Sequence, residues 1–295
     1  CHTAFITKRT QNLQDITKTP IRRRGKFILC DDIKQQMTDE CLTQNYFAKI
    51  QQAIIDKHKL HHTMDHQTQK KVSFGVVRMA NISPCIELAE YLIQTEWEQG
   101  MDAKVMAYHS RQVLLLRSDQ EKHLDQVLKR NEKQGEQPNA FRNPIIRSHL
   151  DNSTAEHVIF IVVATPVEEV GRDHDFDWAV IEPSSFRSII QLAGRVMRHR
   201  RLSIEKANIA LMQYNLKALK GKNVAYCHPG YEQSVSNYDG QFKLMTHDLS
   251  ILLAETRIEE SISSVPRIQK NEVLKPKERL ADLEHQTISF LLTHY

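Results

Sequence analysis

The sequence predicts an α/β protein in which a parallel β-sheet is flanked by helices, with a mainly helical C-terminal extension. Apolar runs of strand length alternate with segments of helical periodicity from Phe27 to Arg201, and this alternation is typical of parallel strands joined by helical crossovers. The run Val158–Ala164 is apolar without interruption, as expected of a strand that helices cover on both faces. After Arg201 the alternation gives way to prolines and helical segments, which predict the extension.

The elements before residue 158 can be placed from their apolar spacing and their breakers. In chain order, we expect a strand at Phe27–Cys30, a helix at Thr43–His58, a strand at Val72–Met79, a helix that begins near Pro84, a strand at Lys104–Tyr108 and a charged helix at Ser118–Arg130. Residues 1–26 are polar and basic and predict a connector, within which Arg22-Arg23-Arg24 is interpreted as a solvated charge run or a contact to DNA phosphate. Residues 129–147 predict a polar loop.

The second half of the chain predicts two strands separated by an acidic loop, and then a helix. Trp178–Ile181 follows the strand at Val158–Ala164 after a loop rich in aspartate. Ser184 or Ser185 can cap a helix that runs to about His199. In the remainder we expect a last strand at Ala207–Tyr214, a loop over residues 217–243, and helices at Leu244–Leu253 and Arg279–Tyr295.

The helix that follows Ser185 carries an unusual polar stripe. Gln191, Arg195 and Arg198 share one side of this helix at spacings of four and three residues. Two guanidiniums without an acid on the same helix are suited to grip an oxyanion. Gly194 stands beside them, where alanine would favour the helix by about 1 kcal/mol, which indicates that a neighbour approaches the backbone closely. For either arginine alone, a contact with a nucleic-acid backbone is the alternative interpretation.

These residues also carry a family resemblance. Val163-Ala164-Thr165 with Gly171-Arg172-Asp173 resembles motif V of superfamily 2 helicases, and Gln191-x-x-Gly194-Arg195-x-x-Arg198 resembles their motif VI. The stretch from Gly171 to Val196 resembles the helicase–nuclease of type I CRISPR interference, most closely the subtype I-F form that is fused to an adaptation protein. The resemblance implies that the sheet belongs to the second RecA-like domain of such an enzyme.

The resemblance implies a nucleotide site on this chain. Gln191, Arg195 and Arg198 would face the γ-phosphate of ATP, with both arginines acting as arginine fingers. Asp173 would reach the ribose, and Gly171 would let the backbone approach the nucleotide. A phosphate loop of the form G-x-x-x-x-G-K-[ST] does not occur in the 295 residues, so ATP and Mg²⁺ are expected as cofactors of the full-length enzyme and none is expected to bind this chain alone.

Nucleic-acid contacts are expected where the predicted strands end. Arg78, Asn81 and Ser83 follow one strand, at the edge where ligands dock in open α/β sheets, and the resemblance places motif IV there. Each of these residues is interpreted equally well as a helix cap or a surface residue. The other DNA contacts that the resemblance implies are Thr165, His109, Ser110 and Arg111.

Three further patterns receive a structural interpretation. His58, His61, His62, Asp65 and His66 have the helical spacing of a metal face, but the run 57–71 is hydrophilic and is expected to be an exposed linker, so we predict no metal site. His174-Asp175 resembles half of a metal phosphohydrolase motif and is interpreted as a coincidence, with Asp175 and Asp177 as turn and strand-edge residues. Asp39-Glu40 follows a polar run and predicts the start of a helix.

Composition limits the remaining possibilities. The net charge is +4, so basic residues act through clusters, and the five cysteines lack metal-site spacing, which indicates a reducing cytoplasm. The sequence contains no apolar run of membrane-spanning length. Both chain ends are expected to be cut from a longer protein.

These observations divide the chain into three expected regions. Residues 1–70 would be a connector and the start of the RecA-like domain, 71–215 the domain itself, and 216–295 the start of an accessory region. The resemblance implies as partners single-stranded DNA, upstream RecA-like and nuclease domains of the same polypeptide, and the CRISPR surveillance complex (Cascade). The isolated chain is expected to be inactive. The alternative is a non-catalytic module, derived from a superfamily 2 helicase, that binds nucleic acid or a partner.

Overall fold

The core of the protein is a mainly parallel β-sheet. The computed structural model describes residues 2–14, 20–34, 38–133, 135–233 and 242–294. Its strands run in the order β1-β7-β6-β3-β5-β4, every neighbouring pair on this path is parallel, and β2 pairs antiparallel with β3. The strands are β1 (Gly25–Ile28), β2 (Thr63–Met64), β3 (Lys71–Arg78), β4 (Met101–Tyr108), β5 (His157–Ala164), β6 (Trp178–Ile181) and β7 (Ile209–Met212).

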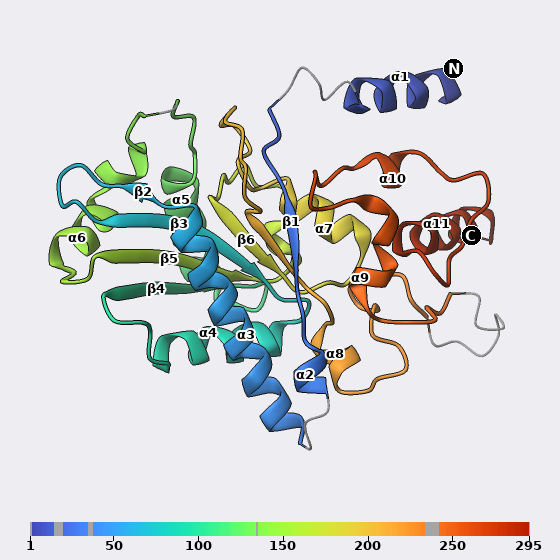
Figure 1. Cartoon of the computed structure of the whole chain (residues 1–295), viewed down its shortest axis with the longest axis horizontal. Helices are drawn as coiled ribbons and strands as arrows, with labels where there is room; N and C mark the ends of the chain where they lie inside the picture. Colours follow the sequence, from blue (N-terminus) through green and yellow to red (C-terminus); the bar gives the residue numbers. More distant parts are fainter. Residues whose placement is uncertain (1, 15–19, 35–37, 134, 234–241, 295) are drawn as a thin grey trace.

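Helices cover both faces of this sheet (Figure 1). On one face α3 (Asp39–Leu60) crosses β3, β6 and β7, and α4 (Ile82–Gln94) packs on β4 and β5. Ser73 of β3 bonds to α3, whereas the next residue, Phe74, faces a cavity walled by α5 (Leu114–Val127) and α6 (Pro144–Asn152). Because successive residues of a strand point to opposite faces, α5 and α6 lie on the other side of the sheet. The predicted α/β class is confirmed.

The remaining helices lie around the ends of the sheet and in the C-terminal extension. They are α1 (His2–Gln14), α2 (Asp31–Lys34), α7 (Phe186–Ala193), α8 (Leu216–Leu219), α9 (Leu249–Leu252), α10 (Val265–Ile268) and α11 (Leu280–His294), with short 3₁₀ turns at Asn139–Arg142, Pro166–Glu168 and Ala254–Thr256. In Figure 1 the extension lies beside the sheet on the side of α7, which α11 contacts. Part of the predicted loop 217–243 falls on residues 234–241, outside the described residues.

Two sequence-based expectations for the first 71 residues are wrong, the second only in part. Residues 2–14, expected to be a loop or connector more than a folded unit, form helix α1, which packs beside α10. The run 57–71 is an exposed linker only in part, because α3 continues to Leu60, and Lys57, His58 and Asp65 are buried. His58 Nδ1 lies 2.8 Å from Ser73 Oγ, and its Nε2 lies 2.9 Å from His157 Nδ1. Polar side chains of this run are therefore satisfied inside the protein, which hydrophilicity alone does not reveal.

The helix start at Asp39-Glu40 is confirmed. Thr38 caps α3 by accepting a hydrogen bond from the backbone N–H of Cys41 at 3.2 Å. Both acids lie in the first turn of the helix, where negative charge complements the helix dipole.

Candidate functional site

The helix that precedes the two arginines is shorter than its periodicity predicts. Ser185 caps α7 in a reciprocal capping box with Ser188, but α7 ends at Ala193. After Gly194 the chain pairs with Phe176, two residues before β6: Phe176 N donates to Arg195 O at 2.8 Å, and Met197 N donates to Phe176 O at 3.0 Å. The prediction that Gln191, Arg195 and Arg198 form one helical stripe is therefore wrong.

Gly194 ends the helix, and among the described residues no neighbouring element lies where a side chain on it would be. A Cβ on Gly194 would lie 3.1 Å from Gln191 O and 3.3 Å from Ile190 O, both in its own helix. The last helical turn therefore fills the space beside the Gly194 Cα, while the guanidinium of Arg23 reaches the Gly194 carbonyl oxygen at 3.5 Å. Gln191 lies in that turn and is half-buried.

Arg195 anchors the loop that follows β5. Its side chain is 6% exposed, and its guanidinium donates to the carbonyl oxygens of Glu168 at 3.2 Å, Glu169 at 2.9 Å and Arg172. Burial lowers the pKa of this guanidinium. All three acceptors belong to the segment between β5 and Asp173, so Arg195 joins the two segments that resemble motifs V and VI.

Arg198 is more accessible and pairs with the acid that was predicted to reach the ribose. Arg198 Nε donates to Asp173 Oδ1 at 2.6 Å, and His199 Nε2 lies 3.0 Å from the same oxygen. The hydrogen bond from Arg198 is the main cause of the lowered pKa of Asp173. The two side chains are 36% and 64% exposed, and an ion pair in such a setting contributes about 0–1 kcal/mol. A stronger anion could therefore replace Asp173 as the partner of Arg198 at little cost.

Gly171 stands at the turn that carries this acid. Its φ of +72° is left-handed, and a Cβ at this position would meet no atom within 4 Å. The conformation alone therefore accounts for glycine here. Gly171, Asp173, Arg195 and Arg198, four residues predicted for the nucleotide, are connected through one loop and its partners.

The residues predicted to contact DNA are brought to one edge of the sheet. Arg78, Ala164 and Tyr108 are in register at the ends of the neighbouring strands β3, β5 and β4, so the segments that follow them start side by side. Exposed side chains in these segments are Ser83, Ser110 and Arg111.

Three other side chains at this edge are less accessible. Asn81 Nδ2 donates to His228 O at 2.8 Å, and Thr165 is 3% exposed. His109 is 8% exposed, and within the described part of the chain its buried Nδ1 has no hydrogen-bond partner. Contacts from Thr165 or His109 to a phosphate would therefore need a movement of the residues that cover them.

Arg78 is a correction to the predicted DNA contacts. Its side chain is fully buried, and the guanidinium donates to Glu169 Oε1 at 2.9 Å, Glu182 O at 2.7 Å and Ser184 Oγ at 2.6 Å. A buried guanidinium with three such partners cannot be drawn to a surface phosphate without leaving Glu169 unpaired. Arg78 instead ties together the segments that follow β3, β5 and β6.

A buried charge cluster below Arg198 was missed by the sequence analysis. Arg200 donates to Asp175 Oδ1 at 2.7 Å and to Asp177 Oδ1 at 2.6 Å, and Arg130 donates to Asp177 Oδ1 at 2.7 Å. All four residues are at most 5% exposed. Asp175 and Asp177 are thus partners of buried arginines, in addition to their places at a turn and a strand edge. The alternation of acids at 173, 175 and 177 was the signal that could have revealed them.

His174 belongs to a second polar group on the same loop. Its Nδ1 lies 2.7 Å from Glu168 Oε1 and its Nε2 lies 3.0 Å from Asp125 Oδ1 on α5. Over residues 2–14, 20–34, 38–133, 135–233 and 242–294, no group of three His, Cys, Asp or Glu side chains is arranged to hold a metal ion.

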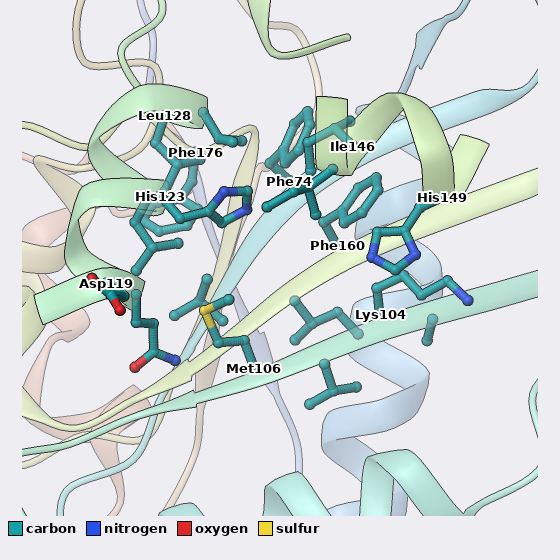
Figure 2. A pocket seen from close by; sticks show the side chains of 18 of the residues that line it. Phe74, Lys104, Met106, Asp119, His123, Leu128, Ile146, His149, Phe160 and Phe176 are labelled. Atoms are coloured by element: carbon teal, nitrogen blue, oxygen red, sulfur yellow. The ribbon is translucent and has the colours of Figure 1, made fainter. Parts of the chain in front are cut away.

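An apolar cavity of about 650 Å³ lies apart from these residues, between the sheet, α5 and α6. Figure 2 shows Phe74 and Phe160, from strands β3 and β5, between His123 and His149, with Phe176 near Leu128. None of the residues predicted for nucleotide or DNA lines it. Its apolar lining also does not suit a triphosphate.

Comparisons with known proteins place this geometry in context. Residues 71–201 match the family model described as CRISPR-associated nuclease/helicase Cas3, C-terminal. The chain is 38% identical over 291 residues to the CRISPR-associated nuclease/helicase Cas3 subtype I-F/YPEST of Pseudomonas aeruginosa (strain UCBPP-PA14), which covers 99% of this chain and 26% of that protein. It is 37% identical over 295 residues to the protein of the same description from Pectobacterium atrosepticum, covering 97% of this chain and 25% of that protein. The chain therefore spans about a quarter of the length of these relatives.

A solved structure also resembles part of the chain. The crystal structure of T. fusca Cas3-AMPPNP matches with a TM-score of 0.41 and 15% identity, over 67% of this chain and 18% of that chain. Among the helices that the structure describes, none is long and apolar enough to cross a membrane.

Proposed function

We propose that this chain is part of an ATP-dependent DNA helicase–nuclease of type I CRISPR interference, because residues 71–201 match the Cas3 C-terminal family model. In this proposal residues 71–215 are its second RecA-like domain, 1–70 a connector and the start of that domain, and 216–295 the start of an accessory region. The observation that supports the proposal best is the contact between the two segments that resemble motifs V and VI. Arg195 donates to the loop that carries Asp173, and Arg198 pairs with Asp173 itself.

The residues present fit the phosphate end of a nucleotide in part. Arg198 offers a partly exposed guanidinium, but the sequence has no phosphate loop, so the cradle for the triphosphate and Mg²⁺ would come from the upstream RecA-like domain. ATP, when bound there, would supply the phosphoryl group whose transfer to water releases free energy. Arg198 would leave Asp173 and donate to the γ-phosphate as an arginine finger, and Gln191 would approach the same phosphate from the end of α7.

Arg195 and Asp173 take roles that follow from their contacts. Arg195 holds three carbonyl oxygens of the motif V loop, so in this conformation it positions the loop. It would act as a second finger after releasing them on domain closure. Asp173, once freed from Arg198, would accept a hydrogen bond from the ribose, and the left-handed turn at Gly171 sets its direction.

Single-stranded DNA would run over the carboxyl edge of the sheet. Ser83, Ser110 and Arg111 are exposed there and would contact phosphates, with Asn81, His109 and Thr165 contributing after local rearrangement. Opening and closing of the cleft between the two RecA-like domains would move the strand. The nuclease domain would lie elsewhere in the full polypeptide, and the CRISPR surveillance complex (Cascade) would deliver the DNA in the cytoplasm.

The proposal is tested in the full-length protein by separating hydrolysis from DNA binding. Arg198→Ala should lower kcat for ATP hydrolysis at saturating single-stranded DNA by at least about 10³-fold, while DNA affinity stays within about twofold. Arg111→Ala should weaken DNA binding and reduce the salt dependence of log K by about one charge, while hydrolysis at saturating DNA is retained. Normal hydrolysis in Arg198→Ala, or an unchanged salt dependence in Arg111→Ala, would contradict the assigned roles.

The second candidate function is a non-catalytic module that binds nucleic acid or a partner. The burial of Arg195 and the pairing of Arg198 with Asp173 favour it, because both arginines already have partners within this chain. This alternative predicts DNA binding that is insensitive to ATP and to Arg198→Ala in the full-length protein, with no effect of that substitution on hydrolysis.

A further inference from the structure

A pair of arginines from the N-terminal part of the chain grips the segment that carries Arg195 and Arg198. We call residues 194–198 the finger segment. Arg22 Nη1 donates to Arg198 O at 2.8 Å and to Met197 O at 3.3 Å. Arg23 Nε donates to Val196 O at 2.9 Å, and its Nη2 reaches Gly194 O at 3.5 Å. The interpretation of Arg22 and Arg23 as a solvated charge run or a DNA contact is therefore wrong, because their donors are used on the backbone of this segment.

The two arginines are themselves fixed in place by the last strand of the sheet. Asn208, which is fully buried, donates through Nδ2 to Arg22 O at 2.9 Å and accepts from Arg24 N at 3.2 Å. The backbone of Arg23 accepts from Ile262 N at 3.1 Å, and Arg24 O accepts from Ile209 N at 3.1 Å. The segment before β1 is thus held to β7 and to the C-terminal extension, so its side chains present a fixed pair of donors.

This arrangement brings like charges together, which requires compensation. Burial lowers the pKa of Arg23 to about 10, and the nearby Arg22 and Arg198 contribute in the same direction. The guanidinium nevertheless stays charged at neutral pH. The carboxylate of Asp175 acts in the opposite direction on this pKa, and together with the carbonyl oxygens that accept from Arg22 and Arg23 it provides the compensation. Met197 has a φ of +47°, a strained conformation for a side-chain-bearing residue that the surrounding contacts must hold.

We propose that Arg22 and Arg23 are positioning residues that fix the backbone of the finger segment, so that Arg198 projects toward the phosphate that it contacts. This inference rests on the proposed function of Arg198. Arg22 and Arg23 do not touch the nucleotide in this assignment, and they act through the carbonyl groups of residues 194–198.

The first test measures ATP hydrolysis by the full-length protein. A misplacement of about 1 Å remote from the reacting atoms can cost about a hundredfold in rate, whereas loss of an arginine finger costs about 10³-fold or more in kcat. Arg23→Ala should therefore lower kcat by about 10- to 100-fold with KM for ATP within about threefold. Arg24→Ala is the matched control, since its guanidinium makes a long, exposed contact of 3.5 Å to Glu259 O, and it should leave kcat unchanged.

A double-mutant cycle separates positioning from a general loss of stability. If Arg23 acts through Arg198, Arg23→Ala should lower kcat in the parent protein and have no further effect in the Arg198→Ala background. An equal fold-loss in both backgrounds would overturn the proposal. If Arg198→Ala itself leaves kcat unchanged, the proposed function of Arg198 is wrong. The double-mutant cycle then contains no finger for Arg23 to position.

Hydrogen exchange gives a readout that does not depend on hydrolysis. The amides of Val196 and Met197 donate to Ala193 O and Phe176 O, so Arg23→Ala should speed their exchange by about tenfold or more, while the amides of β5 stay protected. Arg24→Ala should leave both sets unchanged. Unaltered exchange at Val196 and Met197 in Arg23→Ala would show that the arginine pair does not hold the segment, whatever the ATPase result.

Discussion

Removal of the buried guanidinium of Arg200 tests whether this arginine stabilises the protein by compensating the charges of the buried acids Asp175 and Asp177. Arg200 is 4% exposed and donates to Asp175 Oδ1, Asp177 Oδ1 and Phe176 O at 2.6 to 2.7 Å. In Arg200→Met the volume is largely kept but the charge is lost. Asp177 would retain Arg130 at 2.7 Å and the Phe74 N–H at 2.8 Å, whereas Asp175 would retain the His199 N–H at 2.9 Å as its remaining donor to the carboxylate.

The expected cost follows from the carboxylate left behind. Removing one member of a buried ion pair costs about 3–5 kcal/mol, because the other charge stays buried without compensation. In a protein of this size each kcal/mol shifts the melting temperature by roughly 2–4 °C, so Tm should fall by roughly 10 °C. Arg201→Met is the matched control, since Arg201 is exposed, and its effect should stay within about 0.5 kcal/mol.

Urea denaturation of the same variants provides the free energies directly. Adding Asp175→Asn to Arg200→Met removes the unpaired charge, so the double variant should be more stable than Arg200→Met alone. A loss of less than about 1 kcal/mol in Arg200→Met, or a double variant that is less stable than the single one, would refute the view that Arg200 compensates buried acids.

Two further predictions concern stability. Burial raises the pKa of Glu284 to about 7, so the folded state keeps a proton that the unfolded chain loses near pH 4. The stability that this group contributes is therefore present below pH 4 and is lost as pH rises toward 7. Glu284→Gln should gain about 1–3 kcal/mol over the parent between pH 5 and pH 8, and urea midpoints of variant and parent that change in parallel across this range would contradict the prediction. In Gly75→Ala the added Cβ would lie 2.1 Å from the ring of the fully buried Trp178, so urea denaturation should show a loss of about 1–3 kcal/mol or more, and a stability equal to the parent would show that the ring can move aside.

The sheet could be predicted from the sequence because its strands are covered on both faces. Val158–Ala164 needs apolar residues at every position to satisfy that environment, and the observed β5 spans His157–Ala164. The helix start at Asp39 could also be predicted, since a cap and an acidic first turn are properties of residues adjacent in the sequence.

The residues of the candidate site could be predicted from the sequence, but their arrangement in space could not. Helical periodicity extended α7 through Arg198, whereas the segment after Gly194 instead pairs with Phe176, a partner that local spacing does not reveal. Arg78 was assigned to DNA because it ends a strand, yet its acidic partner Glu169 is 91 positions away in the sequence. Arg22 and Arg23 likewise find their acceptors more than 170 positions away. Tertiary hydrogen bonds of this kind decide which basic residues remain available to a ligand.

The most direct test of the account is the kcat of DNA-stimulated ATP hydrolysis by the full-length protein carrying Arg198→Ala, with Arg201→Ala as the exposed neighbouring control. An arginine finger contributes about 10³- to 10⁵-fold to phosphoryl transfer, so Arg198→Ala should lose at least about 10³-fold in kcat while Arg201→Ala retains the parent rate. A kcat of Arg198→Ala within about tenfold of the parent would show that this guanidinium does not meet the γ-phosphate, and the nucleotide half-site assigned to the chain would then be wrong.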